Sequence, residues 1–292
     1  MRAAFVKLHI SILLAGFTGI FGKLIELAEG PLVWYRMLMT SVFFFLYLAY
    51  RGKLPIVAPR QALAIAGVGV LIALHWIFFY GSIKYANVSI GVVCFALTGF
   101  FTALFEPVLE RRRLSVRELC FSLITVCGIA LIFHFDTRYR TGIILGVISA
   151  AMCALFTIAM RRVGRNHSSS TMLFYQMIGG FCFLTLAAPA YLTLFPGIAL
   201  VPSGPDLLWL FLLSSLCTIG MFLLQIQALR KISAFTVNLS YNLEPVYSII
   251  LAMILFNEAN ELTPAFFAGL GLICVSVALQ SIYAARQRGG VQ

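Results

Sequence analysis

The chain has 292 residues, of which 61% are hydrophobic and only 11% are charged. A water-soluble domain carries about a quarter charged residues, so this composition excludes an ordinary soluble protein. The formal net charge is +11. The basic residues lie in short gaps between apolar stretches, without a patch of interleaved aromatic residues, which argues against a nucleic-acid partner.

Long apolar stretches follow one another along the whole chain. Each is about 20–25 residues long, enough for a helix to cross a hydrocarbon layer of about 30 Å. Because the stretches are continuously apolar rather than alternating, they favour helices over a membrane barrel. The sequence therefore predicts an all-α membrane protein with ten transmembrane helices, at residues 5–26, 31–50, 61–83, 86–109, 115–134, 141–160, 171–195, 206–229, 233–256 and 263–284.

The distribution of charge between these spans predicts their orientation. Sixteen of the 21 lysines and arginines lie in every second gap, counting both ends of the chain. The alternate gaps hold only Lys23, Lys84, Arg138 and Arg140, while Arg36 lies inside the second span. Short loops rich in lysine and arginine remain in the cytoplasm during insertion. We therefore expect a multi-pass protein of the cell inner (plasma) membrane with both termini in the cytoplasm.

The seven cysteines and the small residues of the chain indicate packing. All seven cysteines lie inside spans and form no CxxC pair, so we expect neither a disulfide framework nor a metal site, and no cofactor is indicated. Small residues recur at Ala15–Gly19 and at Gly146–Ala150. Such runs allow two membrane helices to approach closely.

A weak internal repeat relates the two halves of the chain. A shift of 148 residues superposes Glu110 on Glu258, Leu114 on Leu262 and Ser115 on Thr263. Since each half contains five spans, an odd number, the halves enter the membrane from opposite sides. We therefore predict two inverted five-helix repeats, at residues 1–138 and 139–292. Transporters are often built in this way, with a site near the membrane midplane.

Several local motifs resemble those of one transporter family. They are Leu243–Tyr247 with Pro245 thirteen residues before Glu258, then Leu262 and Thr263, and Pro31 preceding Arg36 early in the second span. With ten spans and a five-plus-five repeat, the chain resembles an EamA-like member of the drug/metabolite transporter superfamily. The resemblance covers nearly the whole chain. It implies a proton-driven or exchange-driven carrier, often an exporter of amino acids or other metabolites.

The first half departs from this family pattern. Leu97 stands where the family usually has proline, and Glu106 and Pro107 lie near the end of the fourth span. The family pattern therefore does not define the local helix geometry of the fourth span.

Glu244 is the strongest single candidate for a functional residue. It lies near the middle of the ninth span, where an ionised side chain costs about 2.5–3.5 kcal/mol on insertion scales. It must therefore face protein or water, find a partner or stay protonated. Asn238, Tyr241 and Asn242 share its helix face at 100° per residue, and Pro245 frees the Tyr241 carbonyl group. This pattern indicates a substrate-binding or coupling site, and a glutamate that joins helices through hydrogen bonds is the alternative.

Arg36 is a candidate for binding an anionic group. Its planar guanidinium group can hold a carboxylate through two hydrogen bonds. The alternatives are an ion pair with Glu244 or another glutamate, or extension of the side chain to the membrane surface.

Four further residues complete the predicted site. His75 lies in the third span with Trp76 and Tyr80, and because histidine titrates near neutral pH it is a candidate for a proton relay with Glu244. A hydrogen-bonded packing histidine is the favoured alternative. Gln176 in the seventh span is a candidate polar lining residue or an interhelical hydrogen-bonding residue.

These observations lead to one principal functional hypothesis. We expect a secondary transporter that moves small organic metabolites, such as amino acids or other solutes with a carboxylate, by alternating access. Its expected partners are the lipid bilayer, a small-molecule substrate and protons, as a monomer or homodimer. The alternatives are a membrane-embedded enzyme, for which HExxH and GxSxG motifs are missing, and a passive channel, for which a repeated polar ring is missing.

Overall fold

The computed structural model describes residues 2–111, 116–135, 137–229 and 244–289. Over these residues the fold is all-helical, without strands, as the sequence predicts. The helices are α1 (Arg2–Leu24), α2 (Glu29–Tyr50), α3 (Pro59–Tyr85), α4 (Val88–Phe95), α5 (Thr98–Glu110), α6 (Val116–Phe135), α7 (Arg140–Gly164), α8 (Ser169–Leu194), α9 (Gly204–Ser214), α10 (Met221–Leu229), α12 (Glu244–Phe256) and α13 (Pro264–Gly289), with the π-helix η2 (Ser215–Gly220) and the 3-10 turns η1 (Thr137–Tyr139) and η3 (Glu258–Asn260).

Seven helical stretches within the described residues are long and apolar enough to cross a membrane: Arg2–Leu24, Glu29–Tyr50, Pro59–Tyr85, Val88–Glu110, Arg140–Gly164, Ser169–Leu194 and Gly204–Leu224. Three shorter apolar helices, Ser122–Ile132, Glu244–Phe256 and Pro264–Ser276, lie inside the other three predicted spans. Every predicted span therefore contains helix. The number of membrane crossings stays a prediction.

Two of the predicted spans are not regular α-helices. The fourth is interrupted at Ala96 and Leu97, whose N–H groups donate to carbonyl oxygens three residues earlier, and the Thr98 hydroxyl donates to the Phe95 carbonyl at 2.7 Å. The eighth contains the π-helix η2 between α9 and α10. A π-helical turn is a wider turn that is frequent at functional sites. A hydrophobicity pattern detects neither interruption, because both segments remain apolar.

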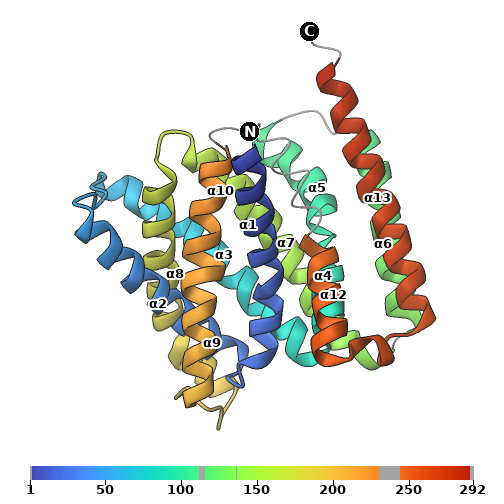
Figure 1. Ribbon diagram of the computed structural model, residues 1–292, viewed down its shortest axis with the longest axis horizontal. Helices are drawn as coiled ribbons and strands as arrows, with labels where there is room; N and C mark the ends of the chain where they lie inside the picture. Colours follow the sequence, from blue (N-terminus) through green and yellow to red (C-terminus); the bar gives the residue numbers. More distant parts are fainter. Residues whose placement is uncertain (1, 112–115, 136, 230–243, 290–292) are drawn as a thin grey trace.

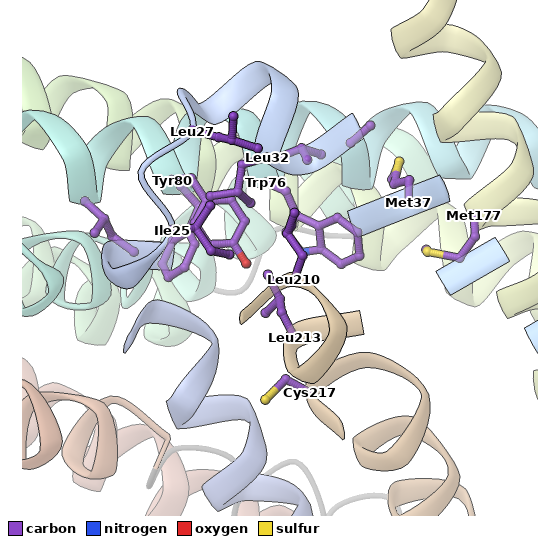
Figure 2. Close-up of a cluster of buried hydrophobic side chains, with 14 of the residues drawn as sticks. Ile25, Leu27, Leu32, Met37, Trp76, Tyr80, Met177, Leu210, Leu213 and Cys217 are labelled. Carbon is purple, nitrogen blue, oxygen red and sulfur yellow. The ribbon is translucent and has the colours of Figure 1, made fainter. Parts of the chain in front are cut away.

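The helices form one bundle with a paired extension (Figure 1). In this bundle α3 packs against α7 and α8, and α1 packs against α10 and α12, while α6 and α13 pair along one side. The largest group of buried apolar side chains lies between α1, α2, α3, α8 and α9, and Figure 2 shows part of it, with Trp76 and Tyr80 close to Leu210, Leu213 and Cys217. Helix α1 begins and α13 ends at the same end of the bundle.

Close helix approach occurs at both predicted runs of small residues. A Cβ atom at Gly16 would lie 3.3 Å from Ser248 Oγ on α12, and one at Gly146 would lie 2.6 Å from Cys94 Cβ on α4. The Ser248 hydroxyl also donates to the Gly16 carbonyl at 3.1 Å. The sequence-based prediction of close packing at these two places is confirmed.

The crossing of α3 and α8 gives a direct test of this packing. A Cβ atom at Gly69 would overlap the backbone carbonyl oxygen of Gln176, whereas one at Gly67, two residues earlier on α3, would meet nothing within 4 Å. We expect Gly69→Ala to lower the free energy of unfolding by about 1–3 kcal/mol, the usual effect of overpacking. Gly67→Ala should leave it unchanged or raise it by up to about 1 kcal/mol. Denaturation in detergent compares the two variants, and equal stabilities would contradict the observed crossing.

Candidate functional site

Arg36 is buried inside the bundle and is held by groups from two other elements. It lies seven residues after the start of α2, about 10 Å along the helix, and its side chain is 2% exposed. Its Nη1 donates to the Tyr80 hydroxyl at 2.6 Å, and its Nε and Nη2 donate to Thr218 Oγ1 at 3.2 and 3.1 Å. The guanidinium carbon lies 3.7 Å from the centre of the Trp76 ring. The structure thus brings together three predicted residues, Arg36, Trp76 and Tyr80, and adds Thr218.

The charge of Arg36 has no acidic partner within the described ranges. The ion pairs found there include Lys23 with Glu258 and Arg161 with Glu106 and Glu110. An isolated buried ion costs several kcal/mol. Stacking on a desolvated tryptophan recovers about 2 kcal/mol, and the hydrogen bonds to Tyr80 and Thr218 recover more. A guanidinium group has five N–H donors, of which these bonds use three. The other two make no hydrogen bond to the described residues.

Local structure explains how the partners of Arg36 reach it. Trp76 and Tyr80 are four residues apart on α3 and therefore share one helix face. The Tyr80 ring packs so tightly against α1 that a Cβ atom at Gly22 would overlap it. Thr218 lies in the π-helical turn, and its hydroxyl donates to the Leu213 carbonyl at 2.9 Å. That bond leaves the oxygen lone pairs of Thr218 to accept from Arg36. A single threonine in an apolar span carries no sequence signal for this role.

His75 is fixed between α3 and α7. Its Nδ1 lies 3.0 Å from the Ser149 carbonyl oxygen and 2.9 Å from Ser149 Oγ, and Ser149 Oγ donates to the His75 carbonyl at 3.1 Å. Its ring also contacts the rings of Phe79 and Phe95. These reciprocal contacts support the packing interpretation. In the described part of the chain no hydrogen bond joins His75 to Glu244.

Gln176 lies on α8 at the crossing with α3. Its side chain is 1% exposed, and Nε2 has no hydrogen-bond partner among the described residues. The same holds for Thr40 Oγ1, one turn after Arg36 on α2. Buried polar atoms are nearly always hydrogen-bonded in folded proteins. Both atoms are therefore candidate contacts for a bound solute.

Glu244 is the first described residue of α12. It is half-buried and lies twelve residues before the end of the helix at Phe256, about 18 Å along its axis. Its carboxyl group lies within electrostatic range of the Cys153 thiol of α7. No hydrogen bond or ion pair of Glu244 is found in the part of the chain that the structure describes. Asn238, Tyr241 and Asn242, which the sequence places on its helix face, lie outside the described residues.

An apolar cavity of about 330 Å³ lies between α2, α3 and α8. Trp34 and Tyr35 line it, together with Tyr191, whose hydroxyl donates to Glu29 at 3.1 Å. Arg36 and Trp76 are not among its lining residues, so this cavity is separate from the guanidinium group.

Comparison with known proteins assigns the chain to a family. The EamA-like transporter family matches residues 4–134 and 140–282. The chain belongs to the EamA-like transporter family. It is therefore a multi-pass membrane transporter with a small-molecule substrate, as the motif resemblance predicts, and this membership is consistent with a protein that is not an enzyme.

Proteins similar to this EamA-like chain include a bacterial relative and a solved structure. An "uncharacterized transporter" of Haemophilus influenzae is 24% identical over 247 residues, which cover 81% of this chain and 77% of the relative. A solved structure, described only as the crystal structure of a protein, superposes with a TM-score of 0.62 at 18% identity. That match covers 97% of this chain and 98% of the other, and it supports the fold alone.

The hydrogen bonds from Arg36 to Thr218 predict a stability difference between two similar substitutions. Thr218→Val keeps the side-chain shape but removes the acceptor of two guanidinium N–H groups, so we expect the free energy of unfolding to fall by about 1–3 kcal/mol. Thr40→Val removes a hydroxyl group that has no hydrogen-bond partner among the described residues, so the free energy of unfolding should stay the same or rise. Denaturation in detergent measures both. A Thr218→Val protein as stable as Thr40→Val would show that the Thr218 contact does not hold Arg36.

Proposed function

We propose that this EamA-like protein is a secondary transporter that moves small organic solutes bearing a carboxylate group across the inner membrane by alternating access. The observation that carries the proposal is the buried Arg36, which has no acidic partner in the described residues and uses three of its five N–H groups. We propose that the direction of transport is export, and this part of the proposal rests only on the resemblance to the family.

A carboxylate fits the arrangement around Arg36 for three reasons. Its single negative charge balances the guanidinium charge, and its two oxygens match two neighbouring N–H groups. Trp76 holds one face of the guanidinium group by stacking. Tyr80 and Thr218 restrict its rotation, so less entropy is lost when the solute binds.

The packing of the helices supports two inverted repeats at 1–138 and 139–292. The third helix of the first repeat, α3, packs against α7, and the corresponding α9–α10 segment packs against α1. The fourth helices behave in the same way, since α4 and α5 pack against α7 while α12 packs against α1. Exchange of the two halves thus reproduces these helix pairs. The two segments that match the family, 4–134 and 140–282, divide the chain near the same point.

The orientation that we propose places the basic loops in the cytoplasm. Helices α5 and α7 end at the end of the bundle where α1 begins and α13 ends. By the charge rule both termini are cytoplasmic, and the loops α1–α2, α3–α4 and α12–α13 face outward. Arg36 then lies about 10 Å below the outer end of α2.

Glu244 is the residue to which we assign the coupling charge. Glu244 has no hydrogen-bond partner in the described residues and lies near half the depth of the membrane, where a carboxyl group is costly to ionise and is often functional. We propose that protonation of Glu244 and binding of the carboxylate at Arg36 are linked steps of the cycle.

Substitution of Arg36 tests the substrate class. Screening a metabolite mixture in proteoliposomes first identifies a transported carboxylate, with saturation separating a carrier from a channel. Arg36→Lys retains the charge but loses the planar fork, so its KM should rise about 10- to 100-fold, the equivalent of about 1.5–3 kcal/mol for a charged hydrogen bond. Arg36→Gln should abolish saturable flux. An unchanged KM in both variants would exclude Arg36 from the binding site.

Substitution of Glu244 tests the coupling. In Glu244→Gln the group can no longer exchange a proton, so uptake driven by an imposed pH gradient should be lost in a protein that still inserts and folds. Glu261→Gln, which alters an exposed residue of the α12–α13 loop, is the matched control and should transport normally. Wild-type, gradient-driven uptake by Glu244→Gln would remove this residue from the mechanism.

A further inference from the structure

Glu258 forms a buried hub where the two halves of the chain meet. It begins η3, directly after Asn257, whose left-handed backbone (φ 57°) turns the chain at the end of α12. Its side chain is 0% exposed. One carboxylate oxygen accepts from Lys23 Nζ at 2.8 Å and from Val88 N at 3.0 Å, and the other accepts from Ser89 N at 2.9 Å and Ser89 Oγ at 2.7 Å.

These bonds join three segments that are far apart in the sequence. Lys23 lies in the last turn of α1, and Val88 and Ser89 form the first turn of α4. The Glu258 carboxylate, in the second half of the chain, therefore caps a helix of the first half. A carboxylate at a helix N-terminus is stabilised by the free N–H groups and by the helix dipole. Burial by itself raises the pKa of Glu258, but the bonds from Lys23, Ser89 and Val88 outweigh it and hold the pKa below its ordinary value. The hub is therefore ionised at neutral pH.

A corresponding ion pair lies at the opposite end of the bundle. Arg161, near the end of α7, pairs with Glu106 and, at 2.8 Å, with Glu110 at the end of α5. The shift of 148 residues that superposes the halves carries Glu110 onto Glu258. Lys23 and Arg161 are not related by this shift, but each lies in the last turn of the first helix of its half. Both ion pairs thus connect the first helix of one half to the fourth span of the other.

The two ion pairs differ in their access to solvent. The Lys23 and Glu258 side chains are 30% and 0% exposed, whereas those of Arg161 and Glu110 are 47% and 13% exposed. Exposed ion pairs contribute little stability, while breaking a buried one leaves a charge without compensation. The bundle is therefore held more firmly at the Glu258 end than at the Arg161 end.

From this arrangement we infer that Glu258–Lys23 and Glu110–Arg161 are the outer and inner gates of the transport cycle. Both pairs are formed in the structure, which corresponds to a state closed at both ends. Opening toward the outside separates Glu258 from Lys23 and from the first turn of α4, while the Arg161 pair keeps the cytoplasmic end closed. The inference rests on the proposed alternating-access function, to which it adds the residues that hold each end shut.

Accessibility of the interface behind the outer gate tests the inference without any substrate. Ala252 is fully buried on α12, six residues before Glu258, where α12 packs against α1 and α4. We would introduce Ala252→Cys into a protein whose seven native cysteines are replaced and label right-side-out vesicles with a membrane-impermeant maleimide. Glu258→Gln should increase the labelling rate at least about tenfold, which corresponds to a shift of about 1.4 kcal/mol toward the outward-open state. Glu261→Gln, three residues away and exposed, should label at the wild-type rate.

The second gate provides the decisive comparison. Arg161→Gln weakens the pair that closes the cytoplasmic end, so adding it to Glu258→Gln should return the labelling rate toward that of the wild type. General damage to the bundle would increase labelling further instead. Lys23→Met, which removes the other partner of the ion pair, should also increase the labelling rate. It is the variant to test if the Glu258→Gln protein does not insert into the membrane. Equal rates in Glu258→Gln and Glu261→Gln, or additive increases with Arg161→Gln, would overturn the inference. A failed carboxylate screen would contradict the proposed function but would not affect this measurement.

Discussion

The arrangement of the bundle centre depends on a guanidinium group that is buried without a carboxylate partner in the described residues. Such a charge persists in a low-dielectric interior only if dipoles and a π face surround it. Tyr80, Thr218 and Trp76 supply these contacts and in doing so draw α2, α3 and the π-helical turn together. The same contacts also orient the guanidinium group toward the binding of the anionic solute that we propose.

Close backbone packing keeps this centre in place. Gly22 allows the Tyr80 ring to lie against α1, and Gly69 allows α3 to cross α8 at the Gln176 carbonyl. Helices in lipid gain little from apolar burial alone, so small residues at crossings contribute much of their association. The hydrogen bonds between His75 and Ser149 add a fixed point between α3 and α7. A rigid α3 therefore presents both Trp76 and Tyr80 to Arg36.

The ends of the bundle differ from its centre in what holds them together. Ion pairs join the two halves there. Both pairs are formed in the structure, so opening either end breaks one pair and leaves the other in place. A bound solute or a proton shifts such an equilibrium only through its different affinity for the two states.

Sequence alone determined the membrane class, the location of the helical spans and the choice of Arg36, Trp76 and Tyr80 as separate candidates, because hydrophobic length, charge between spans and helical spacing are local properties. Only the packing of α2 against α3 brought Arg36 to Trp76 and Tyr80. Tertiary structure decided the contributions of Thr218 and Glu258. Thr218 reaches Arg36 through a π-helical turn within an apolar span, and Glu258 caps a helix some 170 residues away in the chain. Neither contact leaves a periodic signal, since the partners meet only after the helices have packed.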